Sequence, residues 1–567
     1  MTNNAAQMPV LSVENLCIDA RTPEGLRPVL EGVSFEVAKA QTLCLAGESG
    51  SGKSLTALAI MRLLSNSLRL RSGAIRLDGE DLTSLSDRDM RAIRGGKISM
   101  IFQEPMSSLN PVMSIGAQLI EAFRAHRRSD ARASYKSALA MLDAVHIDDA
   151  PRRMQQYPHE LSGGMRQRVM IAMALSCEPK LLIADEPTTA LDVTVQAQIL
   201  KLMRELQREF KTSILMITHD MGVVAEMADR VALLNLGKIV EQGDVGDIFR
   251  RPQQAYTRHL LDVVPRLGTF SGTDAPPRVT PADAPGNQPV KGNILFVKNL
   301  KVSYGGGASL FSGRKTPTDV VKDISFEIKA GHTLGLVGES GSGKSTTGKA
   351  ILGLVPFSGD VVIDGVNISG LDHRAMKPVR RQAQMIFQDP YASLDPRMSI
   401  GEAIAEPLAI HNIGAKSDRA DRVADLLRRV RLLPDVASRY PHEFSGGQRQ
   451  RICIARALAL EPKLIVADES VSALDVSVRV QVLDLLLELQ EQMNIALLFI
   501  SHDMAVVERM SHNVAVMQGG KIVEYGTRRE VFESPQNPYT KALMEAVPLP
   551  DPKPKDVSKH ITHVKGG

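Results

Sequence analysis

The sequence has no tryptophan and only 4% aromatic residues, so it offers few flat side chains on which nucleic-acid bases could stack. Its formal net charge of +4 at pH 7 is too small to indicate a nucleic-acid partner. The cysteines lack the spacing of a metal site or a disulfide framework, and we expect them to be buried apolar residues in a reducing cytosol. They are Cys17, Cys44, Cys177 and Cys453.

Long apolar runs are also missing. No run reaches the roughly 18 residues that a membrane-spanning helix needs, and the longest, such as 495–500, have the length of buried strands. Residues 1–10 are polar and lack the basic start and apolar core of a signal peptide. We therefore expect a soluble chain that acts at a membrane only through partners.

What the chain does contain is an internal repeat. Residues 47–54 recur as 338–345, an offset of 338 − 47 = 291, and residues 184–186 recur as 467–469, an offset of 467 − 184 = 283. The offset drifts between motifs, where loops accept insertions. A length of 567 residues with 43% hydrophobic content is enough for two copies of one fold.

Composition and pattern suggest how the chain is divided. We expect a first domain with a short C-terminal extension over 10–266, a Pro/Gly-rich linker over 267–293, a second domain with its extension over 294–549, and a polar tail over 550–567. Residues 305–318 are predicted to form a surface loop within the second domain. Apolar runs at 42–46, 181–184, 214–217 and 464–467 read as buried parallel strands, and 106–158 as an inserted helical region. Strands alternating with helices predict an α/β fold.

Both copies contain the pattern G-x-x-x-x-G-K-[ST] between an apolar strand and a helix-like stretch. One match could be a flexible glycine-rich loop, but two matched copies favour a phosphate-binding loop, whose backbone N–H groups surround phosphate oxygens. Lys53 and Lys344 would reach the β- and γ-phosphates of ATP, and Ser54 and Ser345 would hold Mg²⁺. The expected loop residues are Gly47, Glu48, Ser49, Gly50, Ser51, Gly52, Lys53 and Ser54, then Gly338, Glu339, Ser340, Gly341, Ser342, Gly343, Lys344, Ser345 and Thr346.

An apolar strand ending in Asp-Glu follows in each copy. We expect Asp185 and Asp468 to hold Mg²⁺, and Glu186 and Glu469 to polarise the attacking water. Alone, such a pair is more often a solvated strand end or a helix cap.

A Ser-Gly-Gly triplet opens a helical stretch in each copy. Serine at a helix start is an ordinary N-cap, but a helix start is also an anion site. Because each copy has its own phosphate loop, a second phosphate site makes sense only if it faces the other copy. The residues are Ser162, Gly163 and Gly164, and Ser445, Gly446 and Gly447.

In their order along the chain these motifs resemble the ABC ATPases. The resemblance implies two P-loop NTPase domains of α/β class, each a RecA-like sheet core with an inserted helical subdomain and an antiparallel β subdomain. It further implies that the units pack head to tail, with Lys53 and Ser445 sharing one ATP and Lys344 and Ser162 the other. The motifs are the phosphate loops, Gln103 and Gln388, the Ser-Gly-Gly triplets, the Asp-Glu pairs, the Ala-Leu-Asp segments 190–192 and 473–475, and His219 and His502.

The same resemblance assigns roles to four further kinds of residue. Gln103 and Gln388 would sense Mg²⁺ and the γ-phosphate beside the surface that meets membrane subunits. His219 and His502 would contact the γ-phosphate, and Asp192 and Asp475 would lie at the nucleotide. An aromatic that stacks on adenine is supplied by Tyr304 in the second copy, whereas Ala20 takes that position in the first, where Arg21 could partly compensate. A one-residue misalignment, or another aromatic reaching in, would remove this difference.

A finer resemblance points to the two ATPases of oligopeptide/dipeptide importers. It rests on segments 102–111, 387–396 and 471–475, and on the C-terminal extensions at 252–257 and 535–540. Met165 and Ser470 depart from the usual motif residues without removing a catalytic group. The cysteine-rich segment of some relatives is absent, so we predict no iron–sulfur cluster.

The sequence therefore predicts an ATP- and Mg²⁺-dependent subunit that energises import, peripheral to the cytoplasmic face of a bacterial inner membrane. Its expected partners are two integral permease subunits and, indirectly, an extracytoplasmic binding protein. Peptides are the favoured cargo, while glutathione, opines and nickel complexes stay open. The alternatives are a tandem ABC protein acting on ribosomes or DNA, which the short Pro/Gly-rich linker disfavours, and an exporter.

Overall fold

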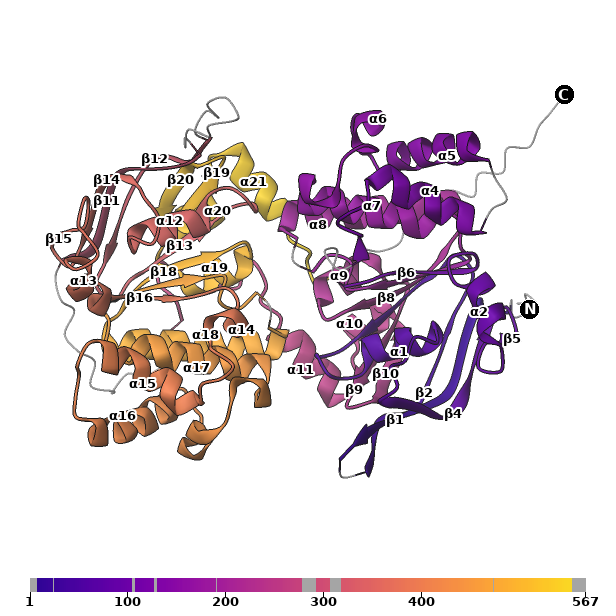
Figure 1. Ribbon diagram of the computed structural model, residues 1–567, viewed down its shortest axis with the longest axis horizontal. Helices are drawn as coiled ribbons and strands as arrows, with labels where there is room; N and C mark the ends of the chain where they lie inside the picture. Colours follow the sequence, from indigo (N-terminus) through magenta and orange to yellow (C-terminus); the bar gives the residue numbers. More distant parts are fainter. Residues whose placement is uncertain are drawn as a thin grey trace. The chain divides into compact units, whose positions relative to one another are not determined.

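The computed structural model describes residues 8–23, 25–103, 108–126, 130–189, 191–277, 292–305, 318–472 and 474–552. Its contacts divide the chain into unit 1 (Met1–Thr189, Ala197–Val264 and Pro548–Gly567) and unit 2 (Ala190–Gln196 and Pro265–Val547). Figure 1 labels the helices and strands of both units. Some expected features lie outside the described residues: Ala190 and Ala473 of the Ala-Leu-Asp segments, part of segment 102–111, most of the linker, nearly all of loop 305–318 and nearly all of the tail.

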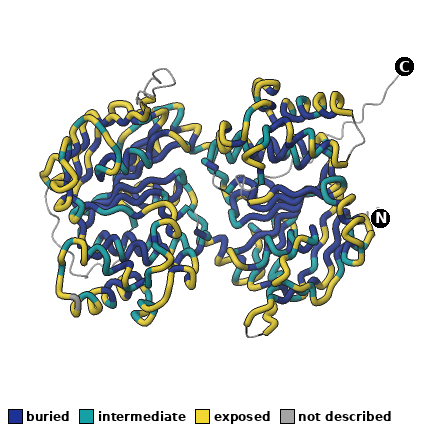
Figure 2. The backbone as a smooth tube through the Cα atoms, viewed as in Figure 1, coloured by how far each residue is buried: buried dark blue, intermediate teal, exposed yellow. Residues whose placement is uncertain are grey.

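The centre of unit 1 is a six-stranded sheet in the order β10-β9-β3-β8-β7-β6. Neighbouring strands are parallel except β10 and β9, which are antiparallel. Strands β3, β7 and β8 are buried at every residue, as expected of parallel strands covered on both faces, and form part of the dark band in Figure 2. This confirms the predicted strands at 42–46, 181–184 and 214–217. The bounds are β3 Thr42–Ala46, β6 Ile98–Ile101, β7 Leu181–Asp185, β8 Ser213–Thr218, β9 Arg230–Asn235 and β10 Lys238–Asp244.

A second, antiparallel sheet in unit 1 has the order β2-β1-β4-β5. Its inward side chains, including Leu11, Ile18, Leu30 and Ile75, belong to one buried cluster with Leu45 of the central sheet. Shared burial of apolar side chains therefore joins the two sheets. The bounds are β1 Leu11–Thr22, β2 Gly25–Val37, β4 Leu68–Leu77 and β5 Glu80–Asp81.

The helices of unit 1 include a separate layer in which α4, α5 and α7 contact one another (Figure 1). This layer confirms the inserted helical region expected over 106–158 and extends it through α7. The bounds are α1 Lys53–Ile60, α2 Asp87–Ile93, α4 Ile115–His126, α5 Ala131–Ala144, α6 Ala150–Arg153, α7 Gly163–Leu175, α8 Val193–Phe210, α9 Met221–Met227, α10 Val245–Arg250 and α11 Ala255–Val263.

Unit 2 repeats this architecture. Its central sheet has the order β16-β17-β18-β13-β19-β20 and its antiparallel sheet the order β12-β11-β14-β15. The predicted strand at 464–467 is confirmed as β17. The strands are β11 Asn293–Tyr304, β12 Thr318–Lys329, β13 Thr333–Val337, β14 Ser358–Ile363, β15 Val366–Asn367, β16 Ala383–Ile386, β17 Leu464–Asp468, β18 Ala496–Ser501, β19 Asn513–Gln518 and β20 Lys521–Thr527.

The helices of unit 2 follow the same sequence of elements, with α15, α16 and α17 in mutual contact as the helical layer. They are α12 Lys344–Ile351, α13 Met376–Gln382, α14 Pro390–Ser393, α15 Ile400–Ile410, α16 Lys416–Arg429, α17 Gly446–Leu458, α18 Val476–Met493, α19 Met504–Met510, α20 Arg528–Glu533 and α21 Pro538–Glu545. Over the described residues, none of the helices combines the length and apolarity needed to cross a membrane.

The first residues of the expected linker are held against unit 2. The backbone N–H of Gly268 donates to the Glu508 carboxylate at 2.8 Å, and the fully buried Arg528 donates to the carbonyl of Thr273. The described part of the linker therefore begins as a segment fixed to the second unit.

Candidate active site

Each glycine-rich loop joins the end of a central strand to the start of a helix, β3 to α1 in unit 1 and β13 to α12 in unit 2. Gly47 has φ +147°, and a Cβ there would lie 2.1 Å from the carbonyl oxygen of Leu234 on β9. Gly338 has φ +154°, and its Cβ would lie 2.1 Å from the carbonyl oxygen of Met517 on β19. Only glycine fits at these two positions.

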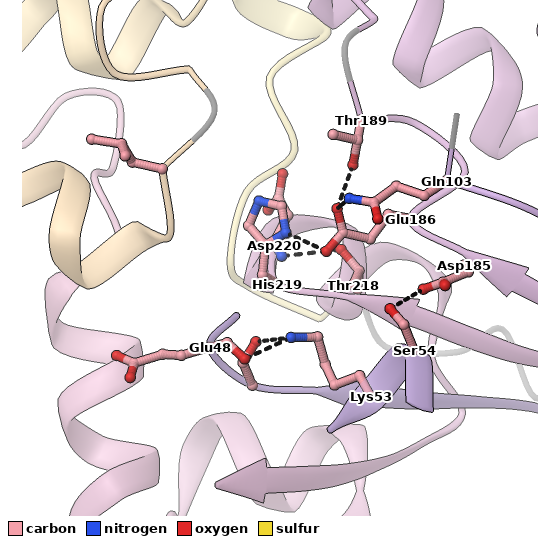
Figure 3. A network of polar contacts seen from close by, with 12 residues as sticks. Glu48, Lys53, Ser54, Gln103, Asp185, Glu186, Thr189, Thr218, His219 and Asp220 are labelled. Carbon is pink, nitrogen blue, oxygen red and sulfur yellow. Dashed lines mark hydrogen bonds and ion pairs between the residues drawn. The ribbon is translucent and has the colours of Figure 1, made fainter. Parts of the chain in front are cut away.

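The loop lysines are buried and point back along their own loops. Lys53 is 5% exposed, and its Nζ donates to the carbonyls of Gly47 and Glu48 at 2.8 Å each (Figure 3). Lys344 makes the same two bonds, of 2.7 and 2.8 Å, in its own loop. Burial lowers the pKa of Lys344, although the charge of Glu469 opposes the shift. Each ammonium is thus held at the loop and can exchange carbonyl oxygens for phosphate oxygens.

A serine hydroxyl and a buried carboxylate meet beside each loop. Ser54 Oγ donates to Asp185 Oδ1 at 3.0 Å, and Ser345 Oγ donates to Asp468 Oδ1 at 2.7 Å. Burial raises the pKa of Asp185 to about 6, although the Ser54 hydroxyl opposes it, and burial raises the pKa of Asp468 as well. A buried carboxylate paired with a hydroxyl is an oxygen donor set that suits a hard cation such as Mg²⁺.

In unit 1, three side chains converge on Glu186 (Figure 3). Its Oε1 lies 3.0 Å from His219 Nδ1, and its Oε2 accepts from Gln103 Nε2 at 3.0 Å and from Thr189 Oγ1 at 2.9 Å. Burial raises the pKa of Glu186, but the hydrogen bonds and charge of His219, with the Thr189 hydroxyl, outweigh burial and hold the pKa below its usual value. The carboxylate is therefore ionised at neutral pH.

In unit 2, Glu469 has two of these three contacts. Its Oε1 lies 3.4 Å from His502 Nδ1, and its Oε2 accepts from Gln388 Nε2 at 2.8 Å. The counterpart of Thr189 is Ser472, since 472 − 189 = 283, and its hydroxyl donates to the backbone carbonyl of Glu469 at 2.9 Å. Burial raises the pKa of Glu469, but His502 outweighs it, so the net shift is downward.

Several residues of the site in unit 2 line one cavity. A cavity of about 190 Å³ is lined by loop residues that include Lys344 and Ser345, together with Gln388 and Glu469. Within each unit, the fold therefore brings together the loop, the Asp-Glu pair, the glutamine and the histidine that the sequence placed far apart.

The Ser-Gly-Gly triplets stand at the starts of α7 and α17. Ser162 Oγ accepts from the N–H of Met165 at 3.3 Å, and Ser445 Oγ accepts from the N–H of Gln448 at 3.4 Å. The expected N-cap role is confirmed at both positions. Both serines are exposed, with Gly163 and Gly164, or Gly446 and Gly447, following in the first helical turn. The expected pairing of each triplet with the other copy's loop depends on how the units are placed, so it stays a prediction.

The Ala-Leu-Asp segments lead into α8 and α18. Asp192 Oδ1 accepts from the N–H of Val195 at 3.0 Å, and Asp475 is the N-cap residue of α18. The Asp192 side chain thus caps the start of α8, and the contact of both aspartates with nucleotide stays a prediction.

Ala20 and Tyr304 occupy equivalent positions in the two antiparallel sheets. Ala20 pairs with Arg27 and Tyr304 with Thr318, so the offsets are 304 − 20 = 284 on one strand and 318 − 27 = 291 on the other. The pairs two residues earlier, 18 with 30 and 302 with 321, give the same two offsets. A one-residue misalignment is therefore excluded. Tyr304 is 45% exposed at its strand end and is accessible to a ligand.

Sequence reasoning missed two kinds of contact at the site. One is the Thr189 hydroxyl on Glu186. The other is a tyrosine of each C-terminal extension, Tyr256 or Tyr539, whose hydroxyl accepts from a backbone N–H of the glycine-rich loop. The sequence shows the extension as a repeated segment, but nothing in a linear sequence indicates that it returns to the loop about 200 residues away.

Comparison with known families agrees with this geometry. A model described as "ABC transporter" matches residues 30–189 and 321–472, and one described as "Oligopeptide/dipeptide transporter, C-terminal region" matches 240–285 and 523–565. The chain belongs to the ABC transporter family. It is an ATP-binding and ATP-hydrolysing subunit with two cassettes, each followed by the C-terminal region of the oligopeptide/dipeptide type.

Relatives match over nearly the whole chain. The present chain is 51% identical to the glutathione import ATP-binding protein GsiA of Pectobacterium atrosepticum, over 96% of this chain and 90% of that protein. It is 51% identical to the protein of the same name from Escherichia coli strain K12, with the same coverage. Among solved structures, the dimeric post-hydrolysis state of the ATP-binding cassette MJ0796 bound to ADP and Pi is 26% identical, with a TM-score of 0.38, covering 41% of this chain and 98% of that one.

Proposed function

We propose that this chain hydrolyses ATP to drive the import of glutathione, or of a short peptide of similar chemistry, through a membrane permease. The observation that carries the proposal is the similarity to glutathione import ATP-binding proteins, at 51% identity over 96% of the chain. The similar region includes both cassettes and both C-terminal regions.

For the chemistry, we assign Glu186 and Glu469 as the groups that orient and polarise the attacking water. Their lowered pKa keeps them ionised, and a carboxylate oxygen can accept more than one hydrogen bond, so each can accept from water while its present partners stay in place. His219 and His502 fix one carboxylate oxygen, and glutamine fixes the other.

Mg²⁺ fits the oxygen-rich side of each site. We assign Ser54, Asp185 and Gln103 in unit 1, and Ser345, Asp468 and Gln388 in unit 2, as the residues that hold it. When bound, this ion neutralises charge on the phosphates of ATP. The bonds between Ser54 and Asp185, and between Ser345 and Asp468, hold each donor pair in place beforehand.

We place the permease contact of unit 2 at a cavity of about 380 Å³ that lies between β16, α15 and α17. It is lined by Phe387, next to Gln388, and by the ion pair of Arg456 with Glu406 at 2.8 Å. A segment bound there would act on the glutamine that contacts Glu469. The full partner set would be two permease subunits and an extracytoplasmic binding protein, with this chain on the cytoplasmic face of an inner membrane.

Uptake of radiolabelled glutathione by cells tests the cargo. Deleting the gene should abolish uptake, the wild-type chain should restore it, and the double variant Glu186→Gln, Glu469→Gln should not. Excess unlabelled γ-glutamylcysteine should compete, whereas an unrelated dipeptide should compete weakly. Retained glutathione uptake in the deletion strain, with loss of uptake of another peptide, would contradict the cargo but leave the importer ATPase intact.

A further inference from the structure

The C-terminal extension of each cassette returns to the glycine-rich loop of the same unit. In unit 1 the backbone N–H of Glu48 donates to the hydroxyl of Tyr256 at 3.2 Å. In unit 2 the backbone N–H of Glu339 donates to the hydroxyl of Tyr539 at 3.0 Å. The two contacts use equivalent residues, since 339 − 48 = 291 is the offset of the loops and 539 − 256 = 283 is that of the later motifs. A contact that occurs twice, between segments about 200 residues apart, is a feature of the fold rather than a local accident.

A half-buried glutamate on the last strand of each unit fixes the start of the tyrosine-bearing helix. Glu241 on β10 accepts from the backbone N–H groups of Gln253 and Gln254, at 2.8 and 3.0 Å, and from the Thr257 hydroxyl. Burial raises the pKa of Glu241, but these three donors outweigh it and leave the pKa lower than usual. The carboxylate therefore stays charged, and a charged acceptor binds the free N–H groups before the helix strongly.

Unit 2 repeats this anchor. Glu524 on β20 accepts from the backbone N–H groups of Gln536 and Asn537, at 2.7 and 3.3 Å, and 524 − 241 = 283. Asn537 also caps α21, because its side chain accepts from the N–H of Tyr539 at 2.8 Å. The tyrosine backbone is thus set by the strand and the cap, and its ring packs against the buried core of unit 2.

The peptide that each tyrosine contacts is the one that the loop lysine also uses. That peptide joins Gly47 to Glu48 or Gly338 to Glu339: the carbonyl of Gly47 accepts from Lys53 Nζ at 2.8 Å, and that of Gly338 accepts from Lys344 Nζ at 2.7 Å. When the lysine turns to a phosphate, it gives up this carbonyl, whereas the tyrosine bond at the N–H side is unaffected. Burial raises the pKa of Tyr539 to about 12, so its hydroxyl stays neutral and accepts this bond at any physiological pH.

We propose that Tyr256 and Tyr539 are positioning residues of the two ATP sites, which hold the first peptide of each glycine-rich loop in its phosphate-binding form. The C-terminal extension is then a part of the nucleotide site, and whatever moves it changes ATP affinity. The proposal rests on ATP binding alone and is independent of the cargo.

The test replaces each hydroxyl in the full-length chain while the other site is disabled. Tyr256→Phe is combined with Lys344→Ala, and Tyr539→Phe with Lys53→Ala. The dissociation constant of radiolabelled ATP with Mg²⁺ is measured by equilibrium dialysis. Losing one net hydrogen bond from the loop should weaken ATP by about 3- to 10-fold, while kcat at saturating ATP changes less than twofold. The thermal unfolding temperature of the nucleotide-free variants should fall by no more than the few degrees that one net hydrogen bond contributes, so the folded state persists under the assay conditions.

Matched controls remove a tyrosine hydroxyl elsewhere in the same unit. The controls are Tyr135→Phe in unit 1 and Tyr525→Phe in unit 2. Tyr135 lies on α5, Tyr525 lies on β20 beside Glu524, and both tyrosines are exposed. Neither should change ATP affinity. An unchanged dissociation constant in Tyr256→Phe and Tyr539→Phe, or an equal change in the controls, would overturn the proposal.

A double-mutant cycle tests the route through the anchor. Glu524→Gln should also weaken ATP, because it loosens the helix start that places the tyrosine. If it acts through Tyr539, this effect should shrink to less than twofold in a Tyr539→Phe background. Equal effects of Glu524→Gln with and without the hydroxyl would show that the extension does not act through the tyrosine and would refute the positioning role.

Discussion

At the scale of single residues, both catalytic candidates have an unusual backbone. Glu186 has φ 48° and Glu469 has φ 44°, in the left-handed region that non-glycine residues seldom adopt. Such a conformation costs on the order of 1–3 kcal/mol. Backbone bonds offset this cost: the N–H of Glu186 donates to the carbonyl of Ile217, and that of Glu469 to Ile500, both at 2.9 Å. In this backbone conformation each carboxylate contacts its histidine and glutamine.

Replacing either carboxylate by an amide should separate binding from hydrolysis. Glu186→Gln and Glu469→Gln keep the shape and leave the loop untouched, so ATP binding should persist. Loss of a general base should cut hydrolysis by about 10²-fold or more at that site. Steady-state ATPase and ATP-binding assays measure both, with the exposed Glu209→Gln and Glu461→Gln as controls. Wild-type turnover in either site variant would rule out that glutamate as an essential base.

We expect the charged Asp185 carboxylate to destabilise the nucleotide-free fold at neutral pH, although the same group is needed for Mg²⁺-dependent hydrolysis. Burial raises its pKa from 3.8 to about 6, so the neutral form is favoured in the fold. Its stabilising contribution is complete below pH 4 and is lost as pH rises through about 6, a penalty of about 3 kcal/mol at pH 7.5.

Asp185→Asn, which is neutral at every pH, should therefore unfold later than the wild type at pH 7.5 when nucleotide is absent. The difference should close as the pH falls to about 4, and Mg²⁺-dependent hydrolysis at that site should be lost. Thermal unfolding at pH 4, 6 and 7.5 measures the trend, with Asp468→Asn as the equivalent in unit 2. A variant less stable than the wild type at pH 7.5 would contradict the sign.

Ala20 in unit 1 takes the position that Tyr304 has in unit 2, and this difference predicts unequal ATP affinities at the two sites. If Tyr304 stacks on adenine, Tyr304→Ala should weaken ATP at the second site by about 5- to 150-fold, since one stack is worth roughly 1–3 kcal/mol. Ala20→Tyr should tighten the first site, which should also discriminate less against other nucleoside triphosphates. Titration of chains with one site disabled measures each affinity. Equal affinities that neither substitution changes would exclude this source of asymmetry.

At the scale of elements, α7 and α17 differ in their first turn. Gln448 completes a capping box, because its Oε1 accepts from the N–H of Ser445 at 3.1 Å; Met165 at the equivalent position has no such acceptor. Met165→Gln should therefore stabilise unit 1 by roughly 0.5–1 kcal/mol, which is about 1–4 °C for a unit of this size. Gln448→Met should destabilise unit 2 by a similar amount. Calorimetry measures the unfolding temperature of both variants. If neither substitution shifts it, the capping box does not contribute to the stability of its unit.

Much of each cassette was predictable because its signals are local. Apolar runs such as 181–184 are buried strands in the structure, and the glycine-rich loops lie where strand and helix patterns meet. The contacts of Thr189 with Glu186 and of Tyr256 with Glu48 were not predictable. The first depends on a rotamer, and the second on how the chain returns across the sheet. Neither leaves a periodicity or a spacing in the sequence.

At the scale of the whole molecule, the chain repeats one architecture while its sites differ in detail. Unit 1 has a threonine hydroxyl on the Glu186 carboxylate, whereas in unit 2 the equivalent Ser472 donates to a backbone carbonyl. Unit 1 lacks both the aromatic at the strand end and the capping box that unit 2 has. The two units therefore differ at three separate places: a strand end, the carboxylate proposed to be catalytic, and a helix start. Two copies in one chain can diverge in this way, because each has to work only in its own position.

The resemblance to ABC ATPases predicts a head-to-tail arrangement, in which the two units cooperate at each ATP. Ser162 and Ser445 are exposed at helix starts, where free N–H groups favour a phosphate. If each faces the other unit's loop, Ser445→Arg should impair the site that contains Lys53, and Ser162→Arg the site that contains Lys344. Crosslinking with a photoreactive ATP analogue, followed by mapping of the labelled peptides, distinguishes the two sites. The exposed Ser438→Arg is a control of the same charge near α17. Loss of labelling confined to the unit that carries the substitution would exclude the head-to-tail arrangement.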